Sequence, residues 1–366
     1  MRMFFVSGIG IAVFIEFLLI SKKKKSASDL ILTLWMFLIL VHLFLLYIHM
    51  TEDVYNFPML LGIELPLPLL HGVFLYFYVA FLTNQLPEKR KALVLHFVPA
   101  SVTYLYLIPF FFLPADQKIQ VYRNHGAGHE LFNIVKSYAI GVSGLCYVIW
   151  SAILLKRHRN TIRDQFSDLD NVNLQWLQTL TIGMGGIWFL VIFFQNEVLV
   201  MTGIVIFVFL IGFFGVRQAD IFAPVQSAAD GDEKKKKYPK SGLTEEVSGK
   251  LHQSLIRLMS EDALYRKSDL LINDLAAKLG VHPNYLSQII NQKEKKNFYD
   301  FVNTYRLEEF KRLIALQKNQ QFTLLSLAYD CGFSSKSSFN RYFKKATGRT
   351  PSEYSTTLSR DQITPS

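Results

Sequence analysis

Long runs of apolar residues fill the first part of the chain and stop near residue 216. A helix needs roughly 20 apolar residues to cross a hydrocarbon core of ~30 Å. Seven runs approach or exceed this length, and we predict a transmembrane helix for each: 3–20, 29–50, 57–82, 92–113, 131–155, 176–194 and 197–216. The chain therefore begins with a predicted seven-helix transmembrane bundle, the domain 1–216.

The loops between these runs differ in positive charge. Clusters of lysine and arginine follow the first, third and fifth runs, at Lys22–Lys25, Lys89–Lys91 and Lys156–Arg163. Because lysine and arginine are enriched in cytoplasmic loops, this alternation predicts an N-terminus outside the cell. Seven crossings then bring everything after Arg217 into the cytoplasm. We expect a multi-pass protein of the bacterial inner membrane.

The third run is the most irregular of the seven. Its passage IELPLPLLHG contains Glu64, Pro66, Pro68 and His71. Ionisable groups are costly in lipid, and two prolines interrupt a helix, so a ligand site at Glu64 and His71 is one interpretation. Hydrogen bonding between helices near the outer interface is the alternative, and we favour it.

A second candidate site lies in the outer loop HGAGHE. His125, His129 and Glu130 are close together there, as metal ligands are, but a fourth ligand is missing. We interpret the passage as a solvated loop and predict neither a metal nor a cofactor.

Composition agrees with two parts in different solvents. The 366 residues are 51% hydrophobic and 19% charged, which is a poor match to a soluble protein. The net charge of +10 alone does not distinguish nucleic acid, anionic lipid and membrane topology. The two cysteines are Cys146, in an apolar run, and Cys331, at a helical core position, so no disulfide framework is expected.

Periodicity is lost from 217 to 242, where small and polar residues and a lysine run predict a flexible cytoplasmic linker. Helical patterning returns in the domain 243–366. Ile272, Leu275 and Leu279 form an apolar stripe, which predicts a helix that ends at Gly280. The next helix begins at once near Pro283, giving a helix, a tight turn and a helix.

The same unit recurs further along the chain. Leu324, Leu327 and Cys331 repeat the apolar stripe, and Gly332 corresponds to the earlier turn glycine. A continuous helical pattern over 298–314 joins the two units, and TPSE at residues 350–353 predicts a capped closing helix. The whole chain is therefore predicted to be all-α.

The second helix of each unit separates polar from apolar side chains at 100° per residue. Its polar face supplies the candidate DNA contacts: Asn284, Ser287, Gln288 and Asn291 in the first unit, and Lys336, Ser337, Asn340, Arg341 and Lys344 in the second. Arginine bonds guanine at two points, asparagine and glutamine bond adenine, and serine bonds either kind of edge. Any amphipathic surface helix has a polar face, but two matched units favour DNA binding.

These passages resemble the AraC/XylS-type transcriptional regulators. GFSSKSSFNRYFKKATGRTPSEY from Gly332 is similar to the second helix-turn-helix signature of that family, and DLAAKLGVHPNYLSQIIN from Asp274 to the first. The resemblance covers about 250–357 and implies two helix-turn-helix subdomains that enter successive major-groove segments. It implies that the following residues read the bases: Asn284, Ser287 and Gln288, then Lys336, Ser337 and Arg341.

Two features depart from the family pattern. His282 and Pro283 stand where a serine cap and a polar residue are common, which leaves the contacts at that helix start open. Family members usually carry a soluble sensor, whereas this chain has the predicted bundle and resembles membrane-bound regulators. Nothing in the soluble sensors transfers to it.

We therefore predict a membrane-anchored, sequence-specific transcriptional regulator that is not an enzyme, with the bundle as its sensor. The expected partners are double-stranded DNA, the lipid bilayer, an unidentified small molecule or membrane signal, and a second copy of the chain in a homodimer. One alternative is a membrane transporter or enzyme with an appended regulatory DNA-binding domain. A passive membrane tether for DNA is another.

Overall fold

The structure, a computed structural model, describes residues 2–23, 25–87, 90–169, 175–217, 245–316 and 321–363. Within these ranges the regular elements are helices, and a single antiparallel bridge joins Phe166 and Leu271. The predicted all-α class is confirmed. The chain forms two compact units, which in the described ranges comprise 2–156 with 175–217 and 157–169 with 245–363.

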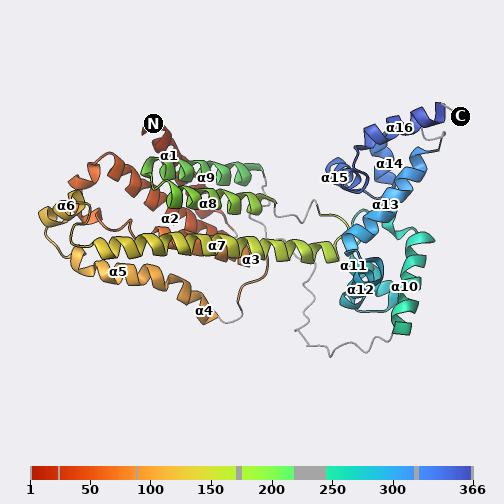
Figure 1. Cartoon of the computed structure of the whole chain (residues 1–366), viewed down its shortest axis with the longest axis horizontal. Coiled ribbons are helices and arrows are strands. Elements are labelled where there is room, and N and C mark those ends of the chain that lie inside the picture. The colour runs from red at the N-terminus through yellow and green to blue at the C-terminus, as the bar shows by residue number, and fades with distance from the viewer. Residues whose placement is uncertain are drawn as a thin grey trace. The chain divides into compact units, whose positions relative to one another are not determined.

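The first compact unit consists mainly of apolar helices (Figure 1). Its elements are α1 (Arg2–Ser21), α2 (Ala27–Met50), η1 (Asp53–Asn56), η2 (Pro58–Leu60), α3 (Pro68–Leu82), α4 (Arg90–Val94), η3 (Leu95–Phe97), α5 (Val98–Phe111), α6 (Ala115–Arg123), α7 (Glu130–Gln165, whose last residues belong to the second unit), α8 (Gln175–Phe193) and α9 (Glu197–Arg217). By length and composition, six helical stretches in the described ranges can cross a membrane: 2–21, 27–50, 91–111, 130–165, 175–193 and 197–214.

The third predicted span differs from its expected form. Residues 57–82 are not one helix, because short turns of 3-10 helix precede α3, which begins at Pro68 and has 15 residues. Such a helix rises only ~22 Å, less than the ~30 Å of a hydrocarbon core. Pro68 lacks a backbone donor and so suits a first helical position, which explains the late start. The number of crossings stays a prediction.

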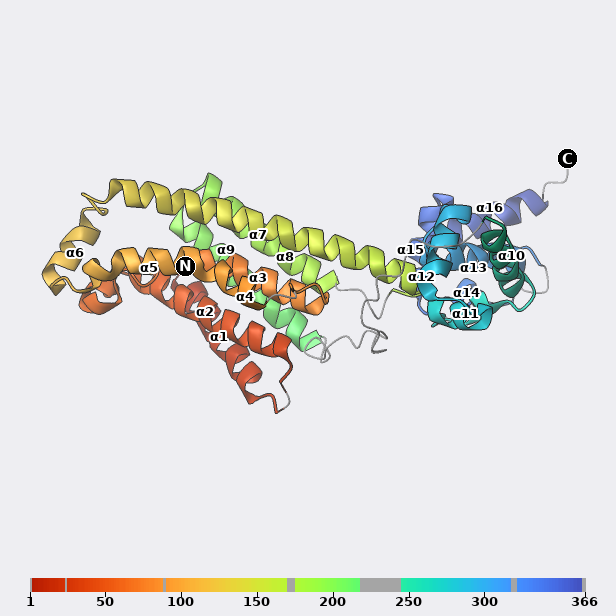
Figure 2. The ribbon, with the colours of Figure 1, turned by 90° about the horizontal axis from the view of Figure 1, so that it is seen from below.

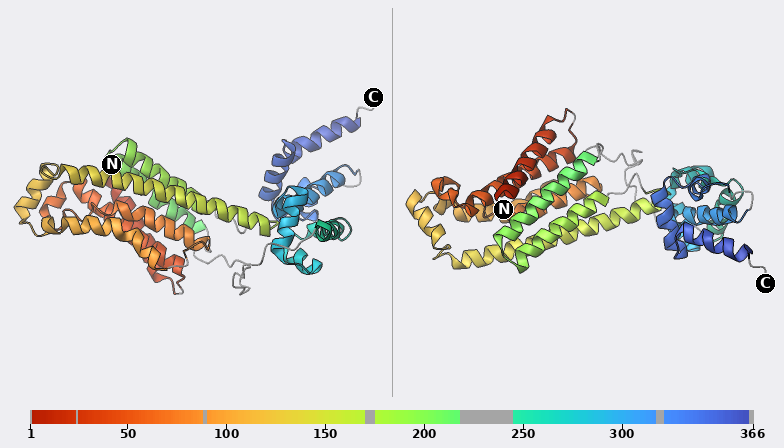
Figure 3. Two further views of the ribbon diagram at one scale, coloured as in Figure 1. Left: turned by 60° about the horizontal axis from the view of Figure 1, so that its bottom comes forward. Right: turned by 90° about the horizontal axis from the view of Figure 1, so that it is seen from above.

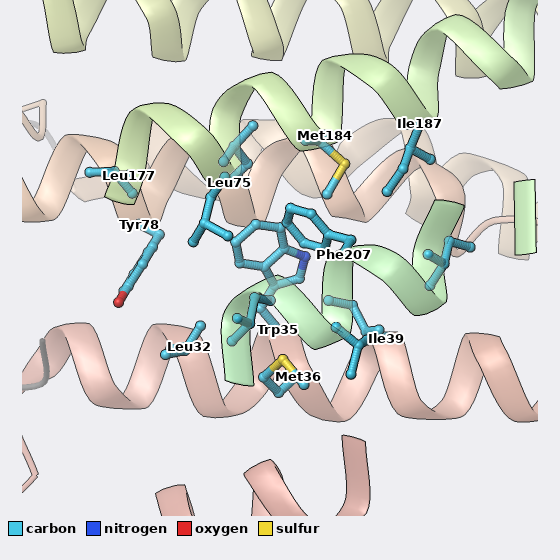
Figure 4. Packing of buried hydrophobic residues seen from close by; sticks show 14 of the residues in the cluster. Leu32, Trp35, Met36, Ile39, Leu75, Tyr78, Leu177, Met184, Ile187 and Phe207 are labelled. Carbon is cyan, nitrogen blue, oxygen red and sulfur yellow. The ribbon is translucent and has the colours of Figure 1, made fainter. Parts of the chain in front are cut away.

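The core of the first compact unit is formed by α1, α2, α3, α7, α8 and α9, and Figure 4 shows the part where α2, α3, α8 and α9 meet. The ring of Trp35 is fully buried, with its centroid 5.8 Å from that of Phe207 and 6.4 Å from that of Tyr78. Figures 2 and 3 show α8 and α9 side by side, with α1 next to α9. Many outward side chains are large and apolar, as expected of a surface that faces lipid.

A glycine allows α7 and α8 to approach closely. A Cβ atom on Gly144 would lie 2.1 Å from the ring of Trp188, so only hydrogen fits at this position. Small residues at helix contacts are common in membranes, where close packing replaces the hydrophobic effect.

The second unit consists of shorter helices arranged around one long helix. Its elements are α10 (Glu245–Ser260), η4 (Leu264–Arg266), α11 (Ile272–Leu279), α12 (Pro283–Ile289), η5 (the π-helical turn Ile290–Glu294), α13 (Phe298–Ile314), α14 (Leu324–Asp330), α15 (Lys336–Thr347) and α16 (Pro351–Ile363). Two hydrophobic clusters share α13, one with α10, α11 and α12 and one with α14 and α15. The predicted joining helix over 298–314 is confirmed. The predicted linker lies, beyond Arg217, outside the described residues.

Candidate nucleic-acid interface

The first helix-turn-helix unit is formed by α11 and α12. Gly280 ends α11 with a φ of 64°, in the left-handed region that favours glycine. The backbone N–H of Asn284 donates to Nδ1 of His282 over 3.2 Å, so His282 caps α12 and Pro283 takes its first position. A histidine therefore caps this helix at the position where the AraC/XylS-type resemblance implies a serine.

The second helix-turn-helix unit repeats this arrangement in α14 and α15. Gly332 turns the chain with a φ of 96°, and a Cβ atom there would lie 2.5 Å from the carbonyl oxygen of Tyr265. The hydroxyl of Ser335 caps α15 by accepting from the backbone N–H of Ser338 over 3.1 Å. The predicted glycine turns are present in both units.

We call α12 and α15 the reading helices. Their apolar faces are buried, with Leu286 and Phe343 fully inaccessible. All the predicted DNA contacts are exposed or half-exposed: Asn284, Ser287, Gln288, Asn291, Lys336, Ser337, Asn340, Arg341 and Lys344. Asn291 lies in the π-helical turn η5, so its direction is not given by 100° per residue.

The helices after the reading helices are capped in matching ways. The backbone N–H of Asp300 donates to Oδ1 of Asn297 at the start of α13. At the start of α16, Thr350 and Glu353 form the predicted reciprocal capping box, with donor–acceptor distances of 2.8 and 3.3 Å. The match between these two helix starts confirms the repeat.

Two charged groups surround the start of α13. The carboxylate of Asp300 accepts from Nζ of Lys345 over 3.0 Å and from Arg163 over 2.9 Å. The hydroxyl of Tyr299 makes hydrogen-bond contacts with Arg341 and Ser338 of the second reading helix. The start of α13 therefore lies against the second reading helix and positions one of its candidate base contacts.

A buried arginine on α13 was not singled out from the sequence. Arg306 is 1% exposed, and its guanidinium donates to the carbonyl oxygens of Tyr265 and Lys267, each over 2.7 Å. Burial lowers the pKa of Arg306 to about 10. A signal was present, because Arg306 stands between Val302 and Phe310 in the apolar stripe at a spacing of four residues.

In the first compact unit, which holds the predicted membrane spans, Glu64 and His71 have separate partners. Oε1 of Glu64 accepts from the hydroxyl of Tyr122 over 2.6 Å, and Nε2 of His71 lies 2.8 Å from Nδ1 of His42. Both residues are buried, and among the described residues Oε2 of Glu64 and Nδ1 of His71 have no hydrogen-bond partner. These two atoms are candidates for contact with a ligand.

The side chains of the outer loop HGAGHE contact protein groups nearby. Its glutamate, Glu130, accepts from the backbone N–H of Gly128, and Nδ1 of His129 lies 3.3 Å from the hydroxyl of Tyr106. Within the described ranges, no group of three or more His, Cys, Asp or Glu side chains is placed to hold a metal ion.

The comparisons with known proteins match only the second compact unit. A family model described as a helix-turn-helix domain matches residues 275–357, which include α12, α14 and α15 and all of α11 except its first three residues. The chain is 37% identical over 93 residues to the uncharacterized HTH-type transcriptional regulator YobQ of Bacillus subtilis, covering 25% of this chain and 37% of that protein. It is 34% identical over 87 residues to the uncharacterized HTH-type transcriptional regulator YijO of Escherichia coli, covering 24% and 30%.

A third relative is named as the regulator of an operon. The Msm operon regulatory protein of Streptococcus mutans is 28% identical over 87 residues, covering 24% of this chain and 30% of its own length. The chain thus spans about a third of the length of these relatives, and no solved structure matches it. The C-terminal part of the chain carries an AraC-type helix-turn-helix domain, and its relatives are transcriptional regulators.

Proposed function

We propose that this protein is a membrane-anchored, sequence-specific transcriptional regulator whose transmembrane part senses a signal. One observation carries the DNA-binding part. Two matched helix-turn-helix units each present a row of hydrogen-bonding side chains on an apolar support, within the segment that matches the helix-turn-helix model. The similarity to transcriptional regulators agrees with this function and gives no support to an enzyme.

The residues that we propose to contact DNA have distinct roles. Arg341 suits guanine, and Asn284 and Gln288 suit adenine, because these side chains match the base edges of the major groove. Lys336 and Lys344, at the two ends of the exposed face of α15, are placed to neutralise phosphates.

Membrane anchoring is supported by the six long apolar helical stretches and by the placement of lysine and arginine in alternate loops. DNA lies in the cytoplasm, so the second unit must be there as well. This requires an odd number of crossings from an outside N-terminus, and α3 with the residues before it would supply the seventh. The partners in this proposal are DNA, the lipid bilayer, a small-molecule or membrane signal, and a second copy of the chain.

Sensing is supported by the buried polar atoms of the first unit. Polar groups without partners are costly inside a membrane, and they persist where they serve a ligand or a conformational change. The candidate ligand contacts are therefore Oε2 of Glu64 and Nδ1 of His71.

An anchor exchange tests this proposal in cells. Residues 1–156 and 175–217 would be replaced by an unrelated membrane anchor that keeps residues 157–169 attached, and chromosomal occupancy and target transcripts would be measured across growth conditions. We expect the exchanged protein to occupy the same loci but to lose its response to conditions, and Glu64→Gln to weaken that response. Unchanged regulation after the exchange would favour passive tethering over sensing.

A further inference from the structure

The cytoplasmic end of α7 is built into the second unit. The helix has 36 residues, whereas a bilayer requires roughly 20, and its residues from Arg157 onward belong to the second compact unit. Ile162 and Leu169 are 5% and 8% exposed and lie in one hydrophobic cluster with Phe310 and Phe343. We call residues 157–169 the docking segment.

Main-chain contacts fix the docking segment in place. The backbone N–H of Ser167 donates to the carbonyl oxygen of Leu270 over 3.2 Å, next to the bridge between Phe166 and Leu271. The carbonyl oxygen of Ser167 accepts from Nδ2 of Asn303 over 3.1 Å and from the buried guanidinium of Arg306 over 3.2 Å. Ser167 itself is 1% exposed. The contact is therefore a specific docked arrangement.

The same segment approaches one candidate DNA contact of each helix-turn-helix unit. Arg163 bonds Asp300, and its guanidinium lies 5.6 Å from the ring centre of Tyr299, whose hydroxyl contacts Arg341. The neighbouring carboxylate of Asp164 lies close to the exposed side chain of Asn291. One candidate DNA contact from each helix-turn-helix unit thus lies near the docking segment: Asn291 is beside Asp164, and Arg341 is connected to Arg163 through Tyr299.

These contacts compete with DNA for the same groups. A carboxylate close to the Asn291 amide competes with the base edge that an asparagine would bond in the major groove. A carboxylate beside Asn291 also repels the phosphates that approach a reading helix, and a released segment would remove that charge from the interface.

We infer that the docking segment is an autoinhibitory element, which holds the DNA-reading residues when docked and frees them when α7 moves. Because α7 is one continuous helix from Glu130 to Gln165, a rotation or shift of its membrane part displaces Arg163 and Asp164 from their partners. The inference rests on the proposed function, because it supplies the route by which a signal in the membrane alters DNA binding.

Charge reversal at Arg163 tests the inference, because autoinhibition and general electrostatics predict opposite changes in the affinity for DNA. In Arg163→Glu the new carboxylate repels Asp300, so the segment should undock. We expect the full-length protein in lipid nanodiscs to bind a genomic DNA fragment, selected by the wild-type protein, about tenfold more tightly than wild type. General electrostatics predicts the opposite, because the variant adds negative charge near DNA.

Arg159→Glu is the matched control, since it makes the same change at an exposed position of the same helix. Its affinity should equal that of wild type or be lower. Arg163→Met removes the pair without reversing charge and should shift the affinity in the same direction as Arg163→Glu, which keeps the test informative if the glutamate variant does not fold.

The outcomes separate the inference from the proposed function. If wild type selects no preferred fragment and neither variant does, specific DNA binding itself is wrong. If wild type binds a preferred fragment and both Arg163 variants bind it no more tightly than Arg159→Glu, autoinhibition is wrong and the docking segment only supports the fold.

Discussion

Gly332→Ala is expected to lower the free energy of unfolding of the second unit by ~3 kcal/mol, because it combines left-handed strain with a clash in a packed core. The added Cβ atom would lie 2.5 Å from the carbonyl oxygen of Tyr265 and 2.8 Å from the backbone of Arg266. Neither is the end of a flexible side chain, so the loop or the turn must move. The angle between α14 and α15 would change with it.

Gly280→Ala is the matched control. This glycine occupies the equivalent turn of the first helix-turn-helix unit, also with positive φ. No heavy atom outside its neighbours lies within 4 Å of the added Cβ. Only the backbone strain remains, and we expect a loss of ~1 kcal/mol.

The thiol of Cys331 provides the measurement. It is fully buried, and burial raises its pKa to about 12, so in the folded protein it reacts slowly with alkylating reagents. Pulsed alkylation against denaturant in a Cys146→Ser background would give the unfolding midpoint of each variant. Equal losses for the two glycines would contradict the close approach at Gly332.

The second large effect concerns base reading. Arg341→Ala is expected to weaken binding to the preferred DNA site about tenfold or more, while binding to unrelated sequence changes far less. Arg341→Lys keeps the positive charge but not the two-point hydrogen bonding, so it should lose most of the same preference. Titrations against specific and scrambled duplexes measure both effects.

Lys344→Ala supplies the contrast for this prediction. A lysine that contacts only phosphate carries no sequence information, so its loss should weaken binding to all sequences alike and reduce the salt dependence by about one counterion. If Arg341→Ala behaved in the same way as Lys344→Ala, Arg341 would be a phosphate contact and its assignment to base reading would be wrong.

Local patterns predicted the second unit well, for a physical reason. A helix repeats every 3.6 residues, so the buried faces of α12 and α15 are visible as apolar stripes, and turn glycines mark positions of positive φ. The exceptions follow from local geometry. The π-helical turn at Asn291 changes the angular spacing, and Pro68 moves the start of α3 into the middle of a predicted span.

The docking segment was not predicted, because its partners lie more than a hundred residues away in the sequence. Ile162, Phe166 and Leu169 are scattered through a polar, charged stretch, which resembles an ordinary cytoplasmic loop. The strongest sequence signal was Arg306, a charge in the middle of an apolar stripe that requires partners from elsewhere in the chain. A buried charge of this kind shows that a partner is required, but it does not identify the partner.

The most direct test of the account is a footprint on DNA by the full-length protein in lipid nanodiscs. Genomic fragments would be selected by the protein, and the preferred fragment would be probed by cleavage protection. Two reading helices on one rigid domain predict two protected major-groove segments on one face of the duplex, about 10 base pairs apart, with the second lost in Arg341→Ala. Selection of no preferred fragment, or uniform protection that Arg341→Ala leaves unchanged, would contradict sequence-specific binding by these helices.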